Sequence, residues 1–188
     1  MSSTLADALR ALAAGQLVVY PTDTLLGLGA DARNPDAVQR LVALKGRPPG
    51  LPVSVALSST EELEPLGAFS EVGRRFVRTH LPGPYTLLVR GYPRARRTLA
   101  PGVSATSGVI GLRVPDHPLA RELARRVGPL TATSANRHGE APCRTLPEAR
   151  RTFGDAVAVY LTGEPRPSGR PSVLVDLTRG SPTPVARK

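Results

Sequence analysis

Short apolar runs alternate with helix-like segments along this chain, and this alternation limits the possible folds more than any other feature. Runs rich in β-branched and aromatic residues predict strands at residues 17–20, 53–57, 86–89, 109–114, 130–133, 156–161, 173–177 and 184–187. Apolar residues at helical spacing, with capping residues before them, predict helices at residues 4–14, 35–45, 70–80 and 118–127 and after Thr145. The mixture favours an α/β or α+β domain built around one sheet.

The length of the chain fits a single domain over residues 1–188, because domains cluster at roughly 100–150 residues and reach about 250. Hydrophobic residues make up 40% of the chain, which argues against wholesale disorder. No apolar run approaches the ~20 residues that a membrane span needs. The first seven residues lack the basic and apolar regions of a signal peptide. We therefore expect a cytoplasmic protein without a membrane partner.

Basic residues outnumber acidic ones, which gives a formal net charge of +10. Such a charge favours polyanionic partners such as nucleotides, pyrophosphate or RNA. Of the 25 basic residues only Lys45 and Lys188 are lysines. A single internal lysine kept against a strong arginine bias indicates a position that needs a compact ammonium group rather than a planar guanidinium group.

Several familiar site types are excluded or disfavoured. Cys143 is the only cysteine, so neither an intramolecular disulfide nor a cysteine-cluster zinc site can form. No spacing typical of metal ligands is present, and no metal site is predicted. The histidines, which are His80, His117 and His138, are scattered, and we expect surface or packing roles for them. The glycines of 27–32 lie too far from the next helix for a dinucleotide-binding turn.

Four polar clusters lie at predicted strand or helix ends, where α/β proteins place ligands. They comprise residues 21–24, 45–47, 113 and 133–136. Cationic side chains can hold phosphate charge, and hydroxyl and amide groups can hold a sugar or an amino-acid head group. Each cluster alone also has an ordinary structural explanation as a turn, a helix-end charge or a cap. Together they predict an anion-binding α/β domain.

The order of these clusters resembles the YrdC/TsaC family of threonylcarbamoyl-AMP synthases along nearly the whole chain. The main motifs are Lys45-Gly46-Arg47 and Ser134-Ala135-Asn136, supported by residues 18–24, 27–32, 82–88, 113–118, 171–177 and 185–187. The chain looks like the short, single-domain form of that family. The resemblance implies a YrdC-like α/β fold, with an open twisted mixed sheet, flanking helices and a basic concave face.

The resemblance also implies an activity and a set of site residues. The reaction is that of a nucleotidyltransferase, in which L-threonine, bicarbonate and ATP give threonylcarbamoyl-AMP and pyrophosphate. Mg²⁺ is expected to assist, and a downstream tRNA threonylcarbamoyl transferase is expected to take the product for tRNA modification. The implied catalytic residues are Lys45 and Arg47. The implied ATP-binding residues are Lys45, Arg47, Ser134, Asn136 and Arg187, and the implied threonine-binding residues are Thr24, Arg113 and Ser172.

Two alternatives stay open at this point. Leu26, Ala56 and Leu161 depart from residues usual in the family, which leaves room for a paralogue that activates a different carbamoyl acceptor. The net charge and the basic segment 92–97, which we expect to be a loop, leave room for a non-enzymatic protein that binds double-stranded RNA or tRNA. Aromatic residues are only 4% of the chain, so stacking platforms for single-stranded RNA are scarce.

Overall fold

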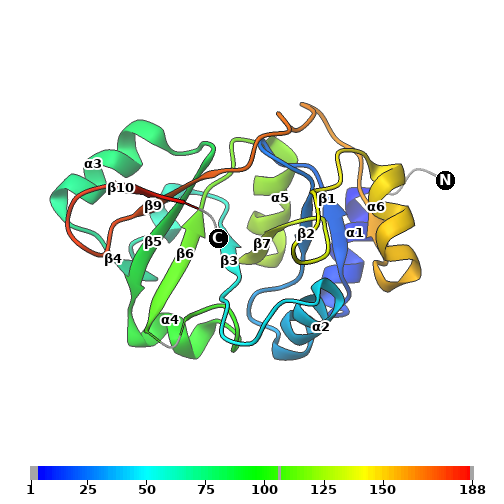
Figure 1. Cartoon of the computed structure of the whole chain (residues 1–188), viewed down its shortest axis with the longest axis horizontal. Coiled ribbons are helices and arrows are strands. Elements are labelled where there is room, and N and C mark those ends of the chain that lie inside the picture. The colour runs from blue at the N-terminus through cyan, green and yellow to red at the C-terminus, as the bar shows by residue number, and fades with distance from the viewer. Residues whose placement is uncertain (1–3, 106, 187–188) are drawn as a thin grey trace.

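The fold is an open, ten-stranded mixed sheet with helices packed on it, as seen in a computed structural model that describes residues 4–105 and 107–186 (Figure 1). The strands are β1 (Val18–Tyr20), β2 (Gly27–Gly29), β3 (Ser54–Ala56), β4 (Gly67–Ala68), β5 (Tyr85–Gly91), β6 (Val109–Arg113), β7 (Leu130–Ser134), β8 (Val159–Tyr160), β9 (Val173–Asp176) and β10 (Thr183–Val185). Their order is β10-β9-β5-β6-β3-β7-β2-β1-β8, and β4 pairs with β5 outside this path.

The helices divide between the two halves of the sheet. They are α1 (Leu5–Ala13), α2 (Pro35–Lys45), α3 (Glu71–His80), α4 (Pro93–Thr98), α5 (Pro118–Val127) and α6 (Leu146–Phe153), with 3₁₀ turns η1 (Thr60–Glu62) and η2 (Gly154–Ala156). Figure 1 shows α3 and α4 beside β5 and β6, and α1, α2 and α6 beside β1 and β2. Among the described residues, no helix has the length and apolar character needed to cross a membrane.

Local sequence sets where α2 begins and ends. The side chain of Asn34 accepts hydrogen bonds from the backbone N–H groups of Asp36 and Ala37, and Pro35 occupies the first turn. Gly46 ends the helix with a left-handed φ of 62°, a conformation that glycine adopts without steric cost. These caps fix Lys45 in the last turn of α2, as the sequence predicted.

The core consists of three apolar clusters that follow the two halves of the sheet. One fills the β3, β5 and β6 region and includes Val55, Leu87 and Leu112. The second packs α2 and α6 against β1 and β2. The third packs α1 and α5 against the same half. The sheet is thereby held rigid beneath the loops that follow its strands.

Two sequence predictions need correction. Residues 92–97 were expected to form a loop, but Pro93–Thr98 form α4, because proline starts a helix well, arginine is a good helix former, and the buried Ala95 anchors the turn. No strand was predicted at 27–29, yet β2 lies there. A Cβ on Gly29 would lie 2.7 Å from Cε1 of Tyr20, so these glycines make room for the Tyr20 ring.

The remaining strand predictions are confirmed with shifted ends. The run 156–161 yields only the two residues of β8, because η2 occupies its beginning. The strand expected at 184–187 is β10, which starts one residue earlier, and residue 187 lies outside the described part of the chain. The single-domain boundary at 1–188 stays a prediction.

Replacement of Leu112 by alanine should destabilise the fold by about 2–5 kcal/mol, because the fully buried side chain lies on the central strand β6 and its loss leaves a cavity. Urea denaturation would measure the change in the free energy of unfolding. Val185→Ala, at an exposed position of β10, serves as the control and should stay within about 0.5 kcal/mol of the parent. Equal losses in the two variants would contradict the assignment of the core.

Candidate functional site

A cleft of about 230 Å³ lies across one face of the sheet. It brings together all the predicted site residues that the structure describes, namely Thr24, Lys45, Arg47, Arg113, Ser134, Asn136 and Ser172. Arg187, the eighth predicted residue, lies outside the described part of the chain. These residues come from the β1–β2 loop, the end of α2, β6, the end of β7 and the segment before β9. Residues far apart in sequence therefore share one site.

The directions of the central strands separate the site residues: β6 runs parallel to β3, and β7 runs antiparallel to it. Ala56 pairs with Arg113 on one side and with Leu130 on the other, so Arg113 and Ser134 lie toward opposite ends of the central strands. Alternate residues of a strand point to the same face, and Ser54 and Ala56 accordingly both line the cleft. The site thus has two separated polar groups with a neutral floor between them.

The first polar group is organised by the buried ammonium of Lys45, whose residue is only 3% exposed. Its Nζ donates to the backbone oxygens of Ser134 at 2.6 Å and Asn136 at 2.7 Å, and to Oδ1 of Asn136 at 3.3 Å. An ammonium has three donors, and these three acceptors match them. Lys45 therefore fastens the end of α2 to the segment that follows β7.

Ser134 and Asn136 complete this first group. The hydroxyl of Ser134 donates to Oδ1 of Asn136 at 2.5 Å. The Nδ2 of Asn136 donates to the backbone oxygens of Arg137 and Glu140, both at 2.8 Å. The Ser-x-Asn motif therefore forms a closed turn, and both residues line the cleft.

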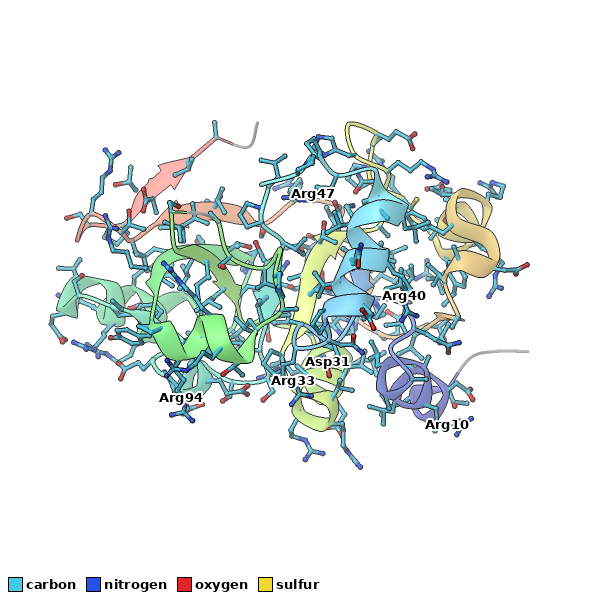
Figure 2. All side chains as sticks on the ribbon, turned by 90° about the horizontal axis from the view of Figure 1, so that it is seen from below. Arg10, Asp31, Arg33, Arg40, Arg47 and Arg94 are labelled. Carbon is cyan, nitrogen blue, oxygen red and sulfur yellow. The ribbon has the colours of Figure 1, made fainter. Side chains whose placement is uncertain are left out.

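Arg47, labelled in Figure 2, follows Lys45 by two residues. Its Nε donates to the backbone oxygen of Leu51 at 3.0 Å, and its Nη2 donates to that of Pro52 at 2.7 Å. The guanidinium also lines the cleft. A cation at this position can hold an anionic ligand against the wall formed by residues 134–136.

The charge of Lys45 is sensitive to pH. Burial, and to a smaller extent repulsion from Arg47, lower the pKa of Lys45 to about 8, against a smaller attraction to Cys143. The ammonium is retained at neutral pH because the two backbone oxygens and Oδ1 of Asn136 hold its three protons.

The second polar group centres on Arg113. Its Nη2 donates to Oδ1 of Asp23 at 2.6 Å in an ion pair whose side chains are 10% and 11% exposed, and its Nη1 donates to the hydroxyl of Thr24 at 3.1 Å. Burial lowers the pKa of Arg113, although the charge of Asp23 opposes that shift. Among the described residues, Nε of Arg113 and Oδ2 of Asp23 are buried without a hydrogen-bond partner. A bound polar ligand could satisfy such donors and acceptors.

Three residues of this second group lay inside the predicted clusters or motifs but received no individual role there. Asp23, from the cluster at 21–24, is the ionic partner of Arg113. Thr22 lines the cleft, with its hydroxyl 3.0 Å from that of Thr24. Thr86 lines it from β5, with its hydroxyl 2.8 Å from that of Ser172. The contacts of Asp23 and Thr86 join segments distant in sequence, which no local pattern could indicate, whereas the contact of Thr22 is local.

His80 and His117 have the packing roles expected from the sequence, whereas His138 is a surface residue that also lines the cleft. His117 is fully buried, caps α5 by accepting from the N–H of Ala120, and bonds through Nε2 to the backbone oxygen of Pro165 at 2.9 Å. Burial also lowers its pKa. His80 stacks on Phe76 with ring centroids 4.1 Å apart. His138 is exposed but lies at the cleft.

The cleft offers little to a directly bound metal ion. Among the described residues, no group of three or more His, Cys, Asp or Glu side chains is placed to hold one. The described lining of the cleft contains no carboxylate, whereas Mg²⁺ prefers oxygen ligands of that kind.

Comparison with known proteins places the chain among a defined set of relatives. A model of the Sua5/YciO/YrdC family, described as "Telomere recombination", matches residues 10–188. A Mycobacterium tuberculosis H37Rv relative is 40% identical over 182 residues, which cover 96% of this chain and 82% of the relative. A Chromohalobacter salexigens protein named threonylcarbamoyl-AMP synthase is 38% identical over 178 residues, which cover 94% of each chain.

Solved structures agree with this placement. The chain is similar to E. coli YciO, with a TM-score of 0.85 and 25% identity, over 97% of this chain and 88% of that one. It is also similar to P. abyssi Sua5 complexed with L-threonine, with a TM-score of 0.84 and 29% identity, over 96% of this chain and 52% of that one. The chain thus spans about half the length of the Sua5 chain that it matches.

The two lysines allow a direct test of the Lys45 environment. In protein labelled with ¹³C-lysine, only Lys45 and Lys188 give side-chain signals. We expect one Cε signal to titrate near pH 8, because burial disfavours the charged form of Lys45. Lys188→Arg assigns the signals by removing the other one. A Lys45 midpoint at the usual ~10.4 of free lysine would contradict the buried geometry.

The Asp23–Arg113 pair should contribute strongly to stability. Replacement of Asp23 by alanine should cost about 3–5 kcal/mol, because it leaves the buried guanidinium of Arg113 without its counter-charge. Chemical denaturation would measure the loss. Glu64→Ala, which breaks the exposed pair of Glu64 with Arg74, is the matched control and should cost under about 1 kcal/mol. A loss at Asp23 no larger than the control would refute the assignment.

Proposed function

The chain belongs to the Sua5/YciO/YrdC family, and on that premise we propose that it is a threonylcarbamoyl-AMP synthase. It converts L-threonine, bicarbonate and ATP to threonylcarbamoyl-AMP and pyrophosphate. The observation that carries the proposal is the convergence of a nucleotide-type group and an amino-acid-type group on one cleft. The complex of P. abyssi Sua5 with L-threonine supports the choice of amino acid.

The reaction proceeds in two steps. The amine of threonine attacks the carbon of bicarbonate, and loss of water gives an N-carboxylate, the carbamate. An oxygen of this carbamate then attacks the α-phosphorus of ATP, and the bond to the bridging oxygen of the β-phosphate breaks. Pyrophosphate leaves with that oxygen, and no covalent intermediate with the protein is required. The protein has to hold two anions close together and offset the charge that develops on the phosphate.

We assign the nucleotide to the first polar group. Arg47 binds its phosphates with a guanidinium already next to the cleft wall. Ser134 and Asn136 form that wall, and Lys45 holds both of them in place while it supplies positive charge beneath the phosphates. Arg187, which belongs to the same predicted set, joins the proposal on resemblance alone.

We assign threonine to the second polar group. Arg113 carries the positive charge that a carboxylate requires, and its buried Nε–H lacks a partner among the described residues. Thr24 and Ser172 add hydroxyl groups on either side. Because both groups line one cleft, the carbamate can form between the amino acid and the α-phosphate.

Mg²⁺, where it takes part, is proposed to enter with ATP. The described cleft lining contains no carboxylate to bind the ion, so phosphate oxygens and water would supply its ligands.

We also propose a cytoplasmic location and delivery of the product to a tRNA threonylcarbamoyl transferase. Direct binding of double-stranded RNA or tRNA stays a proposal that rests on the net charge of +10.

A second candidate is a paralogue that activates a different carbamoyl acceptor. Leu26 and Ala56 line the cleft, so the residues that depart from the family pattern lie where an acceptor would bind. Leu161 instead lines an adjoining cavity. The identity of the amino acid used by the enzyme separates the two candidates.

The decisive measurement is pyrophosphate release from ATP with Mg²⁺, bicarbonate and each amino acid in turn. We expect release with L-threonine and at least a ~100-fold loss of turnover in Arg47→Ala, because one cation at the phosphates is removed. Arg94→Ala, an exposed arginine of α4, is the control and should keep parental turnover. Release with another amino acid alone would favour the paralogue, and no release with any would overturn the enzymatic assignment.

A further inference from the structure

Thr86 is a buried hydroxyl in the cleft to which neither the sequence motifs nor the residue assignments above give a role. It lies near the start of β5, is 3% exposed and lines the cleft directly. Its hydroxyl is 2.8 Å from that of Ser172, which is 7% exposed. Burial of a polar group costs free energy unless the group is hydrogen-bonded, so the contact between these two hydroxyls lowers the cost of placing both inside the cleft.

We propose that Thr86 is a positioning residue that fixes the Ser172 hydroxyl for recognition of the side-chain hydroxyl of the substrate amino acid. This inference rests on the proposed function, and it identifies which part of the amino acid the Ser172 side of the cleft recognises. The occupant is an amino acid with a β-hydroxyl group, whose carboxylate is held at Arg113.

The backbone supports an asymmetric relationship between the two hydroxyls. Thr86 belongs to a regular strand and is β-branched, so its χ1 angle is restricted. Ser172 precedes β9, and its smaller side chain has more rotamers to choose from. The N–H of Val173 donates to the backbone oxygen of Pro84 at 2.8 Å, which holds the two segments in register. Thr86 is therefore the fixed partner, and Ser172 is the one whose direction it sets.

The sheet places this pair at the correct spacing from Arg113. Strands β5 and β6 are antiparallel neighbours, and Leu87 pairs with Leu112. Thr86, which precedes Leu87 on β5, therefore lies opposite Arg113, which follows Leu112 on β6. Residues opposite each other on adjacent strands have Cβ atoms ~4.5–5.5 Å apart. In threonine the carboxylate and the hydroxyl are on adjacent carbons, so a ligand with its carboxylate at Arg113 can reach the hydroxyl pair without leaving the cleft.

Discrimination follows from the chemistry of buried hydroxyls. A substrate hydroxyl can add a hydrogen bond to this buried pair, and an analogue that lacks the hydroxyl cannot make it. The Thr86–Ser172 pair would therefore disfavour 2-aminobutyrate, which has the shape of threonine without the hydroxyl. The pair provides selectivity that the charge of Arg113 cannot supply, since all amino acids carry the carboxylate.

The test compares Thr86→Val, which keeps the shape and removes the hydroxyl, with Thr86→Ser, which keeps the hydroxyl. We expect Thr86→Val to lower kcat/KM for L-threonine about 10–100-fold, to reduce the preference for threonine over 2-aminobutyrate at least ~10-fold, and to leave KM for ATP within about twofold. Thr86→Ser should stay within about threefold of the parent. Thr79→Val, on the exposed face of α3, controls for the substitution itself.

A double-mutant cycle with Ser172→Ala tests whether Thr86 acts through Ser172. The double variant should be no worse than Ser172→Ala alone, because the two changes remove one shared interaction. Unchanged selectivity in a folded Thr86→Val protein, or fully additive losses, would overturn the inference while the proposed function stands.

Calorimetric binding of L-threonine and 2-aminobutyrate provides a readout that does not depend on turnover. A threonine preference that is weakened in Thr86→Val would support the inference even if no pyrophosphate were released, in which case only the proposed reaction would fail. Equal affinity of the parent protein for the two amino acids would overturn the inference.

Discussion

The buried ammonium of Lys45 is the interaction on which the rest of the site depends. It joins the last turn of α2 to the segment after β7, and the cleft wall at 134–136 exists in its present shape because of that join. A guanidinium would be a poor replacement, because its donors lie in one plane and cannot reach the three oxygens that surround Nζ of Lys45. The retained lysine in an arginine-rich chain is thus explained by geometry as well as by charge. Its lowered pKa is the electrostatic cost of a cation placed out of water.

The half of the cleft to which we assign the amino acid uses a different arrangement. There the cation is Arg113, and Asp23 balances it through a side chain that is also nearly buried. A paired cation can be buried at lower cost than a free one, and it keeps further donors for a ligand. One half of the cleft therefore holds its charge with backbone carbonyls and the other holds it with a carboxylate. The hydroxyls of Thr24, Thr86 and Ser172 lie around the second.

Local signals in the sequence predicted most of the fold, and the resemblance in motif order pointed to residues that the structure gathers in one cleft. The binding roles of those residues stay predictions. The caps of α2, the apolar strands and the order of the motifs are all readable along the chain. What it missed depends on contacts across the chain. β2 is glycine-rich and lacks strand propensity, and it forms because the Tyr20 ring occupies the space above Gly27 and Gly29. Asp23 and Thr86 lie in recognised motifs but received no role, because their partners, Arg113 and Ser172, lie about ninety residues away in the sequence.

The Tyr20 ring over β2 has a consequence for how this sequence can change. A methyl group at Gly29 would lie 2.7 Å from the ring, and one at Gly27 would lie 3.0 Å from it. A larger residue at either position is tolerable only with a smaller one at position 20, so the three positions cannot drift independently. Tyr20 immediately precedes the loop that carries Thr22, Asp23 and Thr24. Tyr20 and Gly27 also line the cleft, so a substitution in this trio that shifts the ring would alter the shape of the proposed amino-acid pocket as well as the packing of the core.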